Sequence, residues 1–188
     1  LRLRIEMQTD TGLDLERLHR QADEAIRELL EGDHQIQAAD ICEALMVADV
    51  QGAADVLRPV YDATAGGDGY VSLEVPPDLA YSVERTYETA HQLWRQVARP
   101  NVMIKVPATP EGGPAIRQLI SEGINVNVTL LFACDAYEQV ARTYIEGLEA
   151  RAQQGGDLGQ DCCLLLASVE ISLDRGDIDH ANRTDGLA

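Results

Sequence analysis

The hydrophobic positions in the first third of the chain recur with the period of a helix. Between residues 13 and 31 they fall three or four positions apart, and Gly32 follows the last of them. This spacing predicts a helix over 13–31. It continues through 36–62, where it predicts two further helices, with Asp49 as the cap between them and Pro59 in the last turn of the second.

From residue 63 onward the pattern changes to short apolar segments that alternate with helical ones. The glycine-rich stretch ATAGGDG predicts a loop before this part of the chain. Strands are predicted at 70–75, 101–106, 124–132 and 162–171, and helices at 82–98, 114–122 and 135–151. Repeated strand–helix units predict parallel strands joined by right-handed crossovers.

Polar side chains occupy one parity of three successive predicted strands. They are Ser72 and Glu74, then Lys105, then Asn125, Asn127 and Thr129. Strands of an open parallel sheet are covered on both faces and tend to be apolar throughout, and no glycine-rich nucleotide-binding motif follows any strand. The pattern therefore favours an α/β fold of the (β/α)8 TIM-barrel type, with polar side chains facing the lumen.

Lys105 is the only lysine of the chain, and it lies between apolar residues of its predicted strand. Burial among them favours the neutral amine, which can attack a ketone to form an iminium, an electron sink beside which a carbon–carbon bond can break. Glu74 can then move protons, while Asn127 and Thr129 can hold substrate hydroxyls and a water. The alternative is an exposed lysine with a snorkelling stem, beside a solvated carboxylate and polar groups that satisfy backbone atoms.

Charge and composition disfavour several classes of function. The net charge of −17 disfavours binding to nucleic acid and anionic lipid, and no apolar run is long enough to span a membrane. The N-terminal residues lack the apolar core of a signal peptide. The absence of paired cysteine motifs predicts buried, reduced thiols in a cytoplasmic protein, and the histidine spacing predicts no metal site. The four cysteines are Cys42, Cys134, Cys162 and Cys163.

Three segments, DGYVSLEV, RPNVMIKVPATPEGGPAI and SEGINVNVTLLF, closely resemble the transaldolase family, particularly its longer bacterial members. The stretch ADVQGAADVLRPVYDAT is similar to the helical stretch before that family's glutamate strand, and the resemblance covers about residues 36–155. It implies a (β/α)8 barrel that moves a dihydroxyacetone unit from a ketose phosphate, such as sedoheptulose 7-phosphate or fructose 6-phosphate, to an aldose phosphate. That step belongs to the non-oxidative pentose phosphate pathway.

The resemblance also implies roles for residues. Lys105 would be the Schiff-base lysine, Glu74 the carboxylate that works with a catalytic water, and Asn127 and Thr129 substrate- and water-holding residues. No cofactor or metal is implied. Ser172 and Arg175 are candidates for the family's serine and phosphate-binding arginine.

The first 21 residues contain neither the family's aspartate strand nor its TSNPT-like strand. A full barrel typically needs about 250 residues. We therefore expect a single partial barrel domain over 1–188, shortened at both ends, with a divergent helical segment at 1–35 and a family core at 36–155.

Three functions remain open. The first is a transaldolase, and the second is a Schiff-base aldolase that releases its three-carbon unit without transfer. The third is a non-catalytic relative that serves as an assembly or binding module and self-associates through open barrel edges. The expected partners of the first two are sugar phosphates.

Overall fold

The structure is a computed structural model that describes residues 15–156 and 164–166. The chain divides into two compact units, one up to Asp49 and one from Val50 onward. All of the described strands lie in the second unit. The prediction of a single barrel domain preceded by a divergent segment at 1–35 stays a prediction.

Two helices, α1 (Leu15–Gly32) and α2 (Ala38–Ala63), open the described chain. The helix predicted at 13–31 agrees with α1. The prediction of two helices over 36–62 was wrong, because α2 runs without interruption through Asp49 and Pro59. Its alanine-rich sequence has high helix propensity, and Pro59 stands about one turn before the end, so the hydrogen bond that it removes lies near the end of the helix.

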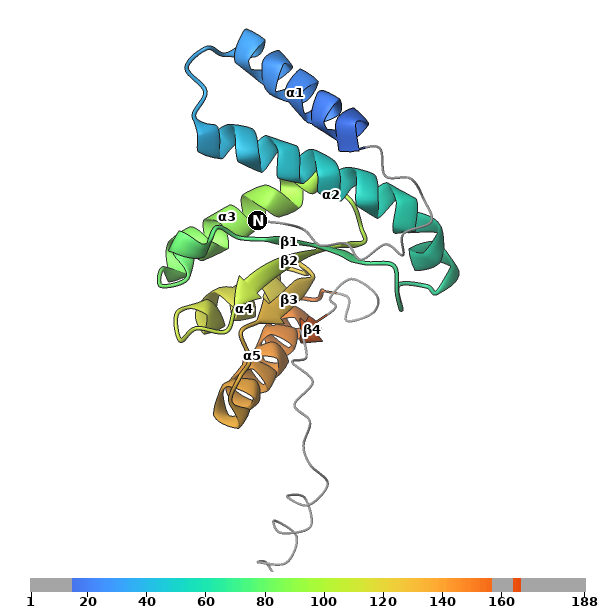
Figure 1. Cartoon of the computed structure of the whole chain (residues 1–188). Helices are drawn as coiled ribbons and strands as arrows, with labels where there is room; N and C mark the ends of the chain where they lie inside the picture. The colour runs from blue at the N-terminus through green and yellow to red at the C-terminus, as the bar shows by residue number, and fades with distance from the viewer. Residues whose placement is uncertain (1–14, 157–163, 167–188) are drawn as a thin grey trace, which may run out of the picture. The chain divides into compact units, whose positions relative to one another are not determined.

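The second unit contains a four-stranded sheet, and every neighbouring pair of strands is parallel. The strands follow chain order: β1 (Val71–Glu74), β2 (Val102–Pro107), β3 (Val126–Thr129) and β4 (Leu164–Leu166). Between them lie the short 3-10 helix η1 (Pro77–Leu79) and the helices α3 (Val83–Val97), α4 (Gly112–Ser121) and α5 (Cys134–Gln153). This sequential order is the one that repeated right-handed crossovers produce in a (β/α) barrel (Figure 1).

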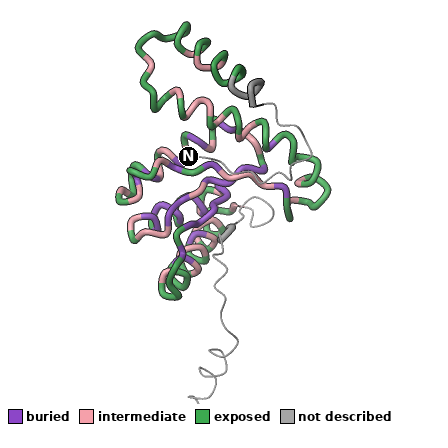
Figure 2. Tube along the Cα trace, viewed as in Figure 1, coloured by how far each residue is buried: buried purple, intermediate pink, exposed green. Residues whose placement is uncertain are grey.

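Strand alternation separates two faces of the sheet. On the helix face, Ile104 is paired with Leu73 and Val126, and all three side chains are buried. On the opposite face, which we call the site face, Lys105 is paired with Glu74 and Asn127. The buried part of the unit follows β2, β3 and α4 in Figure 2. The apolar core therefore lies between the sheet and its crossover helices.

Side-chain hydrogen bonds fix the loops at the ends of β2. The fully buried Asn101 donates from Nδ2 to the carbonyls of Ala54 at 2.8 Å and Gly69 at 2.9 Å, which ties α2 and the start of β1 to the start of β2. At the other end, the Thr109 hydroxyl donates to the Ala80 carbonyl at 2.6 Å and accepts from the N–H of Gly112 at 2.9 Å. These bonds hold the carboxyl ends of β1 and β2 together.

Gly112 is required where α4 begins. A Cβ atom at this position would collide with the carbonyl oxygen of Pro107, at the end of β2. The first turn of α4 can therefore approach the strand end only because residue 112 has no side chain. The close approach keeps the β2–α4 loop short and places the helix start directly behind the site face.

The cysteine prediction requires a correction. Cys42 and Cys134 are both exposed free thiols, whereas Cys162 and Cys163 lie outside the described residues. Cys42 lies on the surface of α2, and Cys134 is the first residue of α5, where the chain leaves the sheet. Within the described ranges, no helix combines the length and the apolar character that crossing a membrane requires.

Candidate active site

Glu74, Lys105 and Asn127 occupy one row across the site face of the sheet. The register pairs Glu74 of β1 with Lys105 of β2, and Lys105 with Asn127 of β3. Side chains that are paired in a parallel sheet project from the same face, so all three point to one side. Thr129 lies two residues further along β3, level with Pro107. The four residues that sequence singled out on these strands are thus brought together.

The Lys105 amine and the Glu74 carboxylate are in direct contact. The Nζ atom of Lys105 donates to Oε2 of Glu74 at 3.1 Å. The two side chains are 33% and 50% exposed, so the expectation that Lys105 is buried was wrong. Its apolar chain neighbours Ile104 and Val106 are fully buried, but alternation turns them toward the helices. Ile104 and Val106 are therefore next to Lys105 in the sequence but do not surround its side chain.

Two acceptor atoms near Lys105 are buried without a partner among the described residues: Oδ1 of Asn127 and Oγ1 of Thr129. Both side chains are nearly inaccessible, at 7% and 6% exposure. A buried acceptor without a hydrogen bond is costly, so sites of this kind normally bind a hydroxyl or a water in the functioning protein. The row thus combines an amine, a carboxylate and two acceptors.

Ser72 is a further member of the site face that the sequence did not assign to the site. Its hydroxyl accepts a hydrogen bond of 2.9 Å from Nδ2 of Asn127, although the two residues belong to β1 and β3. The parity of Ser72 was the only signal in the sequence. The candidates Ser172 and Arg175 lie outside the described residues.

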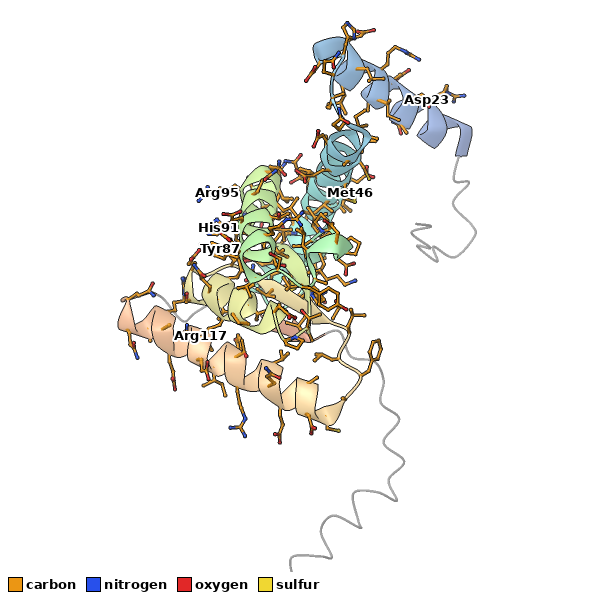
Figure 3. The ribbon with its side chains drawn as sticks, turned by 90° about the vertical axis from the view of Figure 1, so that its left-hand side faces the viewer. Asp23, Met46, Tyr87, His91, Arg95 and Arg117 are labelled. Atoms are coloured by element: carbon orange, nitrogen blue, oxygen red, sulfur yellow. The ribbon has the colours of Figure 1, made fainter. Side chains whose placement is uncertain are left out.

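A second cluster of titratable groups lies away from the site face, between α3 and the end of α4. Glu122 accepts from the Tyr87 hydroxyl at 2.8 Å and contacts Nε2 of His91 at 2.5 Å. Tyr87, His91 and Arg95 follow one side of α3 in Figure 3. Gln118 of α4 also donates to Glu122 at 3.4 Å, so the bonds from Tyr87 and His91 are the ones that join Glu122 to a neighbouring helix.

The hydrogen bonds of this cluster shift two pKa values. Burial alone would raise the pKa of the Glu122 carboxyl, but the hydrogen bonds from His91, Tyr87 and Gln118, together with the charge of His91, leave that pKa below its ordinary value. The hydrogen bond to Glu122, with a smaller contribution from burial, raises the pKa of Tyr87. These shifts favour a charged Glu122 that fastens α3 to α4.

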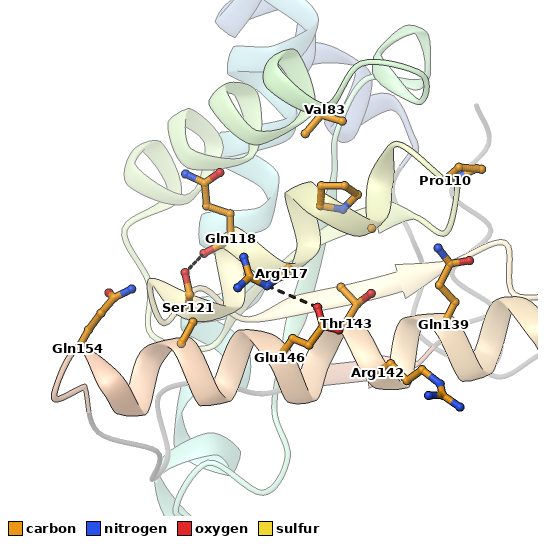
Figure 4. A pocket seen from close by; sticks show the side chains of 13 residues that line it. Val83, Pro110, Arg117, Gln118, Ser121, Gln139, Arg142, Thr143, Glu146 and Gln154 are labelled. Atoms are coloured by element: carbon orange, nitrogen blue, oxygen red, sulfur yellow. Dashed lines mark hydrogen bonds and ion pairs between the residues drawn. The ribbon is translucent and has the colours of Figure 1, made fainter.

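A hollow of about 660 Å³ lies between α4 and α5, as Figure 4 shows. Arg117 and Arg142 line it, and both are paired, with Glu146 at 3.5 Å and Glu138 at 3.9 Å. None of the residues that line it belongs to the site-face row. We therefore place the candidate site at the row and not in this hollow.

Comparison with known proteins gives a consistent result. A sequence model of the Transaldolase/Fructose-6-phosphate aldolase family matches residues 15–162. A transaldolase of Trichodesmium erythraeum is 48% identical over 140 residues, which are 74% of this chain and 36% of that protein. Transaldolase 2 of Nostoc sp. is 46% identical over 142 residues, 74% of this chain and 37% of the relative. A Thermobifida fusca transaldolase is 56% identical over 110 residues, 58% of this chain and 30% of its own length.

The chain thus spans somewhat more than a third of the length of the first two relatives. Both the resemblance and the (β/α) barrel-type fold class are confirmed, since the family match covers all of the described sheet except β4. With a parallel sheet in chain order, a lysine–glutamate row and this match, the chain belongs to the Transaldolase/Fructose-6-phosphate aldolase family.

Proposed function

We propose that this chain carries the Schiff-base centre of a transaldolase, with Lys105 as the nucleophile and Glu74 as the proton-transferring carboxylate. The observation that carries the proposal is the 3.1 Å contact between Nζ of Lys105 and Oε2 of Glu74, in one register row with Asn127. The family match and the printed names of the relatives support it.

The chemistry begins with a proton transfer. An ammonium group cannot attack a carbonyl, so the Lys105 nitrogen gives a proton to the adjacent carboxylate or to water. The amine then adds to the ketone carbon of a ketose phosphate, and loss of water gives an iminium. The iminium accepts the electron pair of the carbon–carbon bond next to it, while a base removes the proton of the departing carbinol. An aldose phosphate leaves, and an enamine of dihydroxyacetone stays on Lys105.

In the second half the enamine carbon attacks the aldehyde of an acceptor aldose phosphate, whose oxygen takes up a proton. Water then hydrolyses the new iminium, which frees Lys105 and the ketose phosphate product. Glu74, directly or through a water, returns the proton that it took in the first half. Asn127 and Thr129 supply buried acceptors for sugar hydroxyls or for that water. Ser172 and Arg175 are proposed to bind the distal hydroxyl and phosphate.

The single lysine makes the test unusually specific. The full chain is incubated with fructose 6-phosphate and borohydride, and its intact mass is measured. We expect a stable mass gain that maps to Lys105, the only ε-amine of the chain. Absence of an adduct on the unmodified sequence would remove the proposal.

A matched control relocates the lysine. The variant Lys105→Arg retains the charge beside Glu74 but cannot form an imine, and should give no adduct. Adding Arg117→Lys places one lysine on the exposed surface of α4, where Arg117 is 51% exposed. This double variant should also give no adduct. A mass gain on the new lysine would show that reaction with the sugar requires no particular site.

An aldolase is the second candidate, because the family description includes fructose-6-phosphate aldolase. In that reaction the enamine is protonated and released as dihydroxyacetone. Turnover that accelerates strongly with an aldose phosphate acceptor identifies transfer. Turnover that is independent of the acceptor, with release of dihydroxyacetone, identifies an aldolase.

The third candidate is a non-catalytic relative that self-associates through strand edges. Oligomers in solution without a borohydride adduct would favour it. For the catalytic chain we propose a cytoplasmic location, sugar phosphates as substrates, and a place in the non-oxidative pentose phosphate pathway.

A further inference from the structure

The hydrogen bond from Asn127 to Ser72 passes over an entire strand. Ser72 lies in β1 and Asn127 in β3, and β2 runs between them. Strands are about 4.8 Å apart, so β1 and β3 are separated by about 10 Å. The 2.9 Å bond therefore requires the Asn127 carboxamide to lie across the surface of β2.

Register fixes where the carboxamide crosses. Asn127 is level with Lys105, whereas Ser72 is paired with Met103, two residues earlier on β2. The carboxamide thus lies at the foot of the Lys105 side chain, on the side of Met103. Its Nδ2 atom donates to Ser72, and its Oδ1 atom is buried without a partner among the described residues.

We propose that Ser72 is a positioning residue that holds the Asn127 carboxamide in place across β2, beside Lys105. A serine hydroxyl both donates and accepts, so the bond fixes where the carboxamide lies rather than which of its ends can face the hydroxyl. With Nδ2 bonded to Ser72, Oδ1 is the group presented beside Lys105. An oxygen can only accept, so this orientation selects a hydroxyl donor on the bound sugar.

This inference rests on the proposed function and names the part of the substrate that it concerns. The ligand is a polyhydroxylated ketose, and the recognised group is a hydroxyl next to the carbon that becomes bonded to Lys105. Without Ser72 the carboxamide loses its anchor on β1 and is free to leave its place beside Lys105. Ser72 itself needs no contact with the sugar.

The first test measures the carboxamide in the free protein and needs no activity. Nitrogen-15 spectra of the full chain give the two Nδ2 protons of Asn127, identified by their loss in Asn127→Ala. We expect Ser72→Ala to accelerate the exchange of these protons with water by about tenfold, because a bond of this class contributes that order to protection. Ser72→Thr, which keeps the hydroxyl, should restore slow exchange.

The matched control is Ser82→Ala. Ser82 also accepts a hydrogen bond through its hydroxyl, from the Arg85 N–H at 3.4 Å, but it caps α3 and does not touch the Asn127 carboxamide. Its loss should leave the Asn127 protons unchanged. Equal exchange in Ser72→Ala and in the unmodified chain would overturn the inference.

The second test is a double-mutant cycle on the rate of adduct formation with fructose 6-phosphate. We expect Ser72→Ala to lower this rate about tenfold in the unmodified chain and to have no further effect in the Asn127→Ala background. Ser72→Thr should recover most of the rate. If the rate losses of Ser72→Ala and Asn127→Ala multiply in the double variant, Ser72 does not act through Asn127.

The two tests separate the possible failures. If the unmodified chain forms no adduct, the proposed function fails, while the exchange of the Asn127 protons still decides whether Ser72 holds the carboxamide in place. If the adduct forms but Ser72→Ala changes neither measurement, only the positioning inference fails.

Discussion

Two glutamates, Glu74 and Glu122, each pair with one basic side chain, yet their surroundings differ. Glu74 meets Lys105 on the site face, and its side chain is half exposed. Glu122 meets His91 and also Tyr87, and its side chain is 31% exposed. Its carboxyl pKa lies below the ordinary value because the hydrogen bonds outweigh burial. Within the described part of the chain, Glu74 is bonded to Lys105 alone, whereas Glu122 is bonded to several residues.

The difference indicates how a carboxylate is suited to its task. A group that must give and take protons cannot be strongly committed to one protonation state. A group that joins two helices is more useful when it stays charged and bonded at every working pH. Both glutamates form an ion pair. The number of hydrogen-bond partners therefore distinguishes the proton-transferring carboxylate from the structural one better than the ion pair does.

The largest effect is expected from Glu74→Gln. Removal of the proton-transferring carboxylate should lower turnover of fructose 6-phosphate by about 100- to 10,000-fold, while the borohydride adduct on Lys105 still forms. Steady-state kinetics and intact mass measure the two outcomes. Glu122→Gln is the control, and its turnover should be unchanged. If Glu74→Gln keeps normal turnover, Glu74 has no part in the mechanism.

Next in size is a change on the helix face of the same strand. Ile104→Ala removes a fully buried side chain and should lower the free energy of unfolding by about 2–5 kcal/mol. Urea unfolding followed by circular dichroism measures it. Lys105→Met, one residue later, should abolish the adduct with a much smaller effect on stability. Similar losses of stability in both variants would contradict the view that the helix face stabilises the fold while the site face carries the chemistry.

Glu122→Gln should have a moderate structural effect. The amide keeps the size of the carboxyl group but loses charge, which weakens its bonds to Tyr87 and His91. We expect a loss of about 1 kcal/mol of unfolding free energy, measured by the same denaturation. Glu88→Gln, on the surface of α3, is a matched control that should change little. Equal stability of the two variants would mean that the cluster does not fasten the helices.

The smallest effect is a pH dependence of stability. Because the pKa of Glu122 in the folded chain is below its ordinary value of 4.5, its contribution is complete above pH 4.5 and is lost as the pH falls through the lower folded value. Unfolding curves at a series of acidic pH values should therefore show a smaller decline for Glu122→Gln than for the unmodified chain. Parallel declines would assign the acid sensitivity to other carboxylates.

Sequence was sufficient for the strand order and for the shared face of Glu74, Lys105 and Asn127. The period of a strand is two, so parity alone assigns a face to each residue. Parity does not give register, which depends on how separate strands align, and the Ser72–Asn127 bond was therefore not predictable. The exposure of Lys105 was missed for a related reason, since residues adjacent in a strand lie on opposite faces.

The helices show a similar limit. The start of α3 at Ser82 followed from its capping chemistry, which is local. The uninterrupted α2 did not follow, because Asp49 and Pro59 are local signals that the helix overrides. Of the partners of Glu122, Gln118 is local, but His91 and Tyr87 lie 31 and 35 positions away on a different helix, and no local pattern contains them.

Glu74, Lys105 and Asn127 are level with one another only in the native register, so the reactive centre also reports whether the strands have paired correctly. If β2 were to pair with its neighbours one residue out of step, Lys105 would turn into the helix layer and an aliphatic side chain would replace it. No partly aligned sheet can bring the three groups level. Capture of a sugar by the lone ε-amine during refolding would thus time the moment at which the strands reach their final alignment.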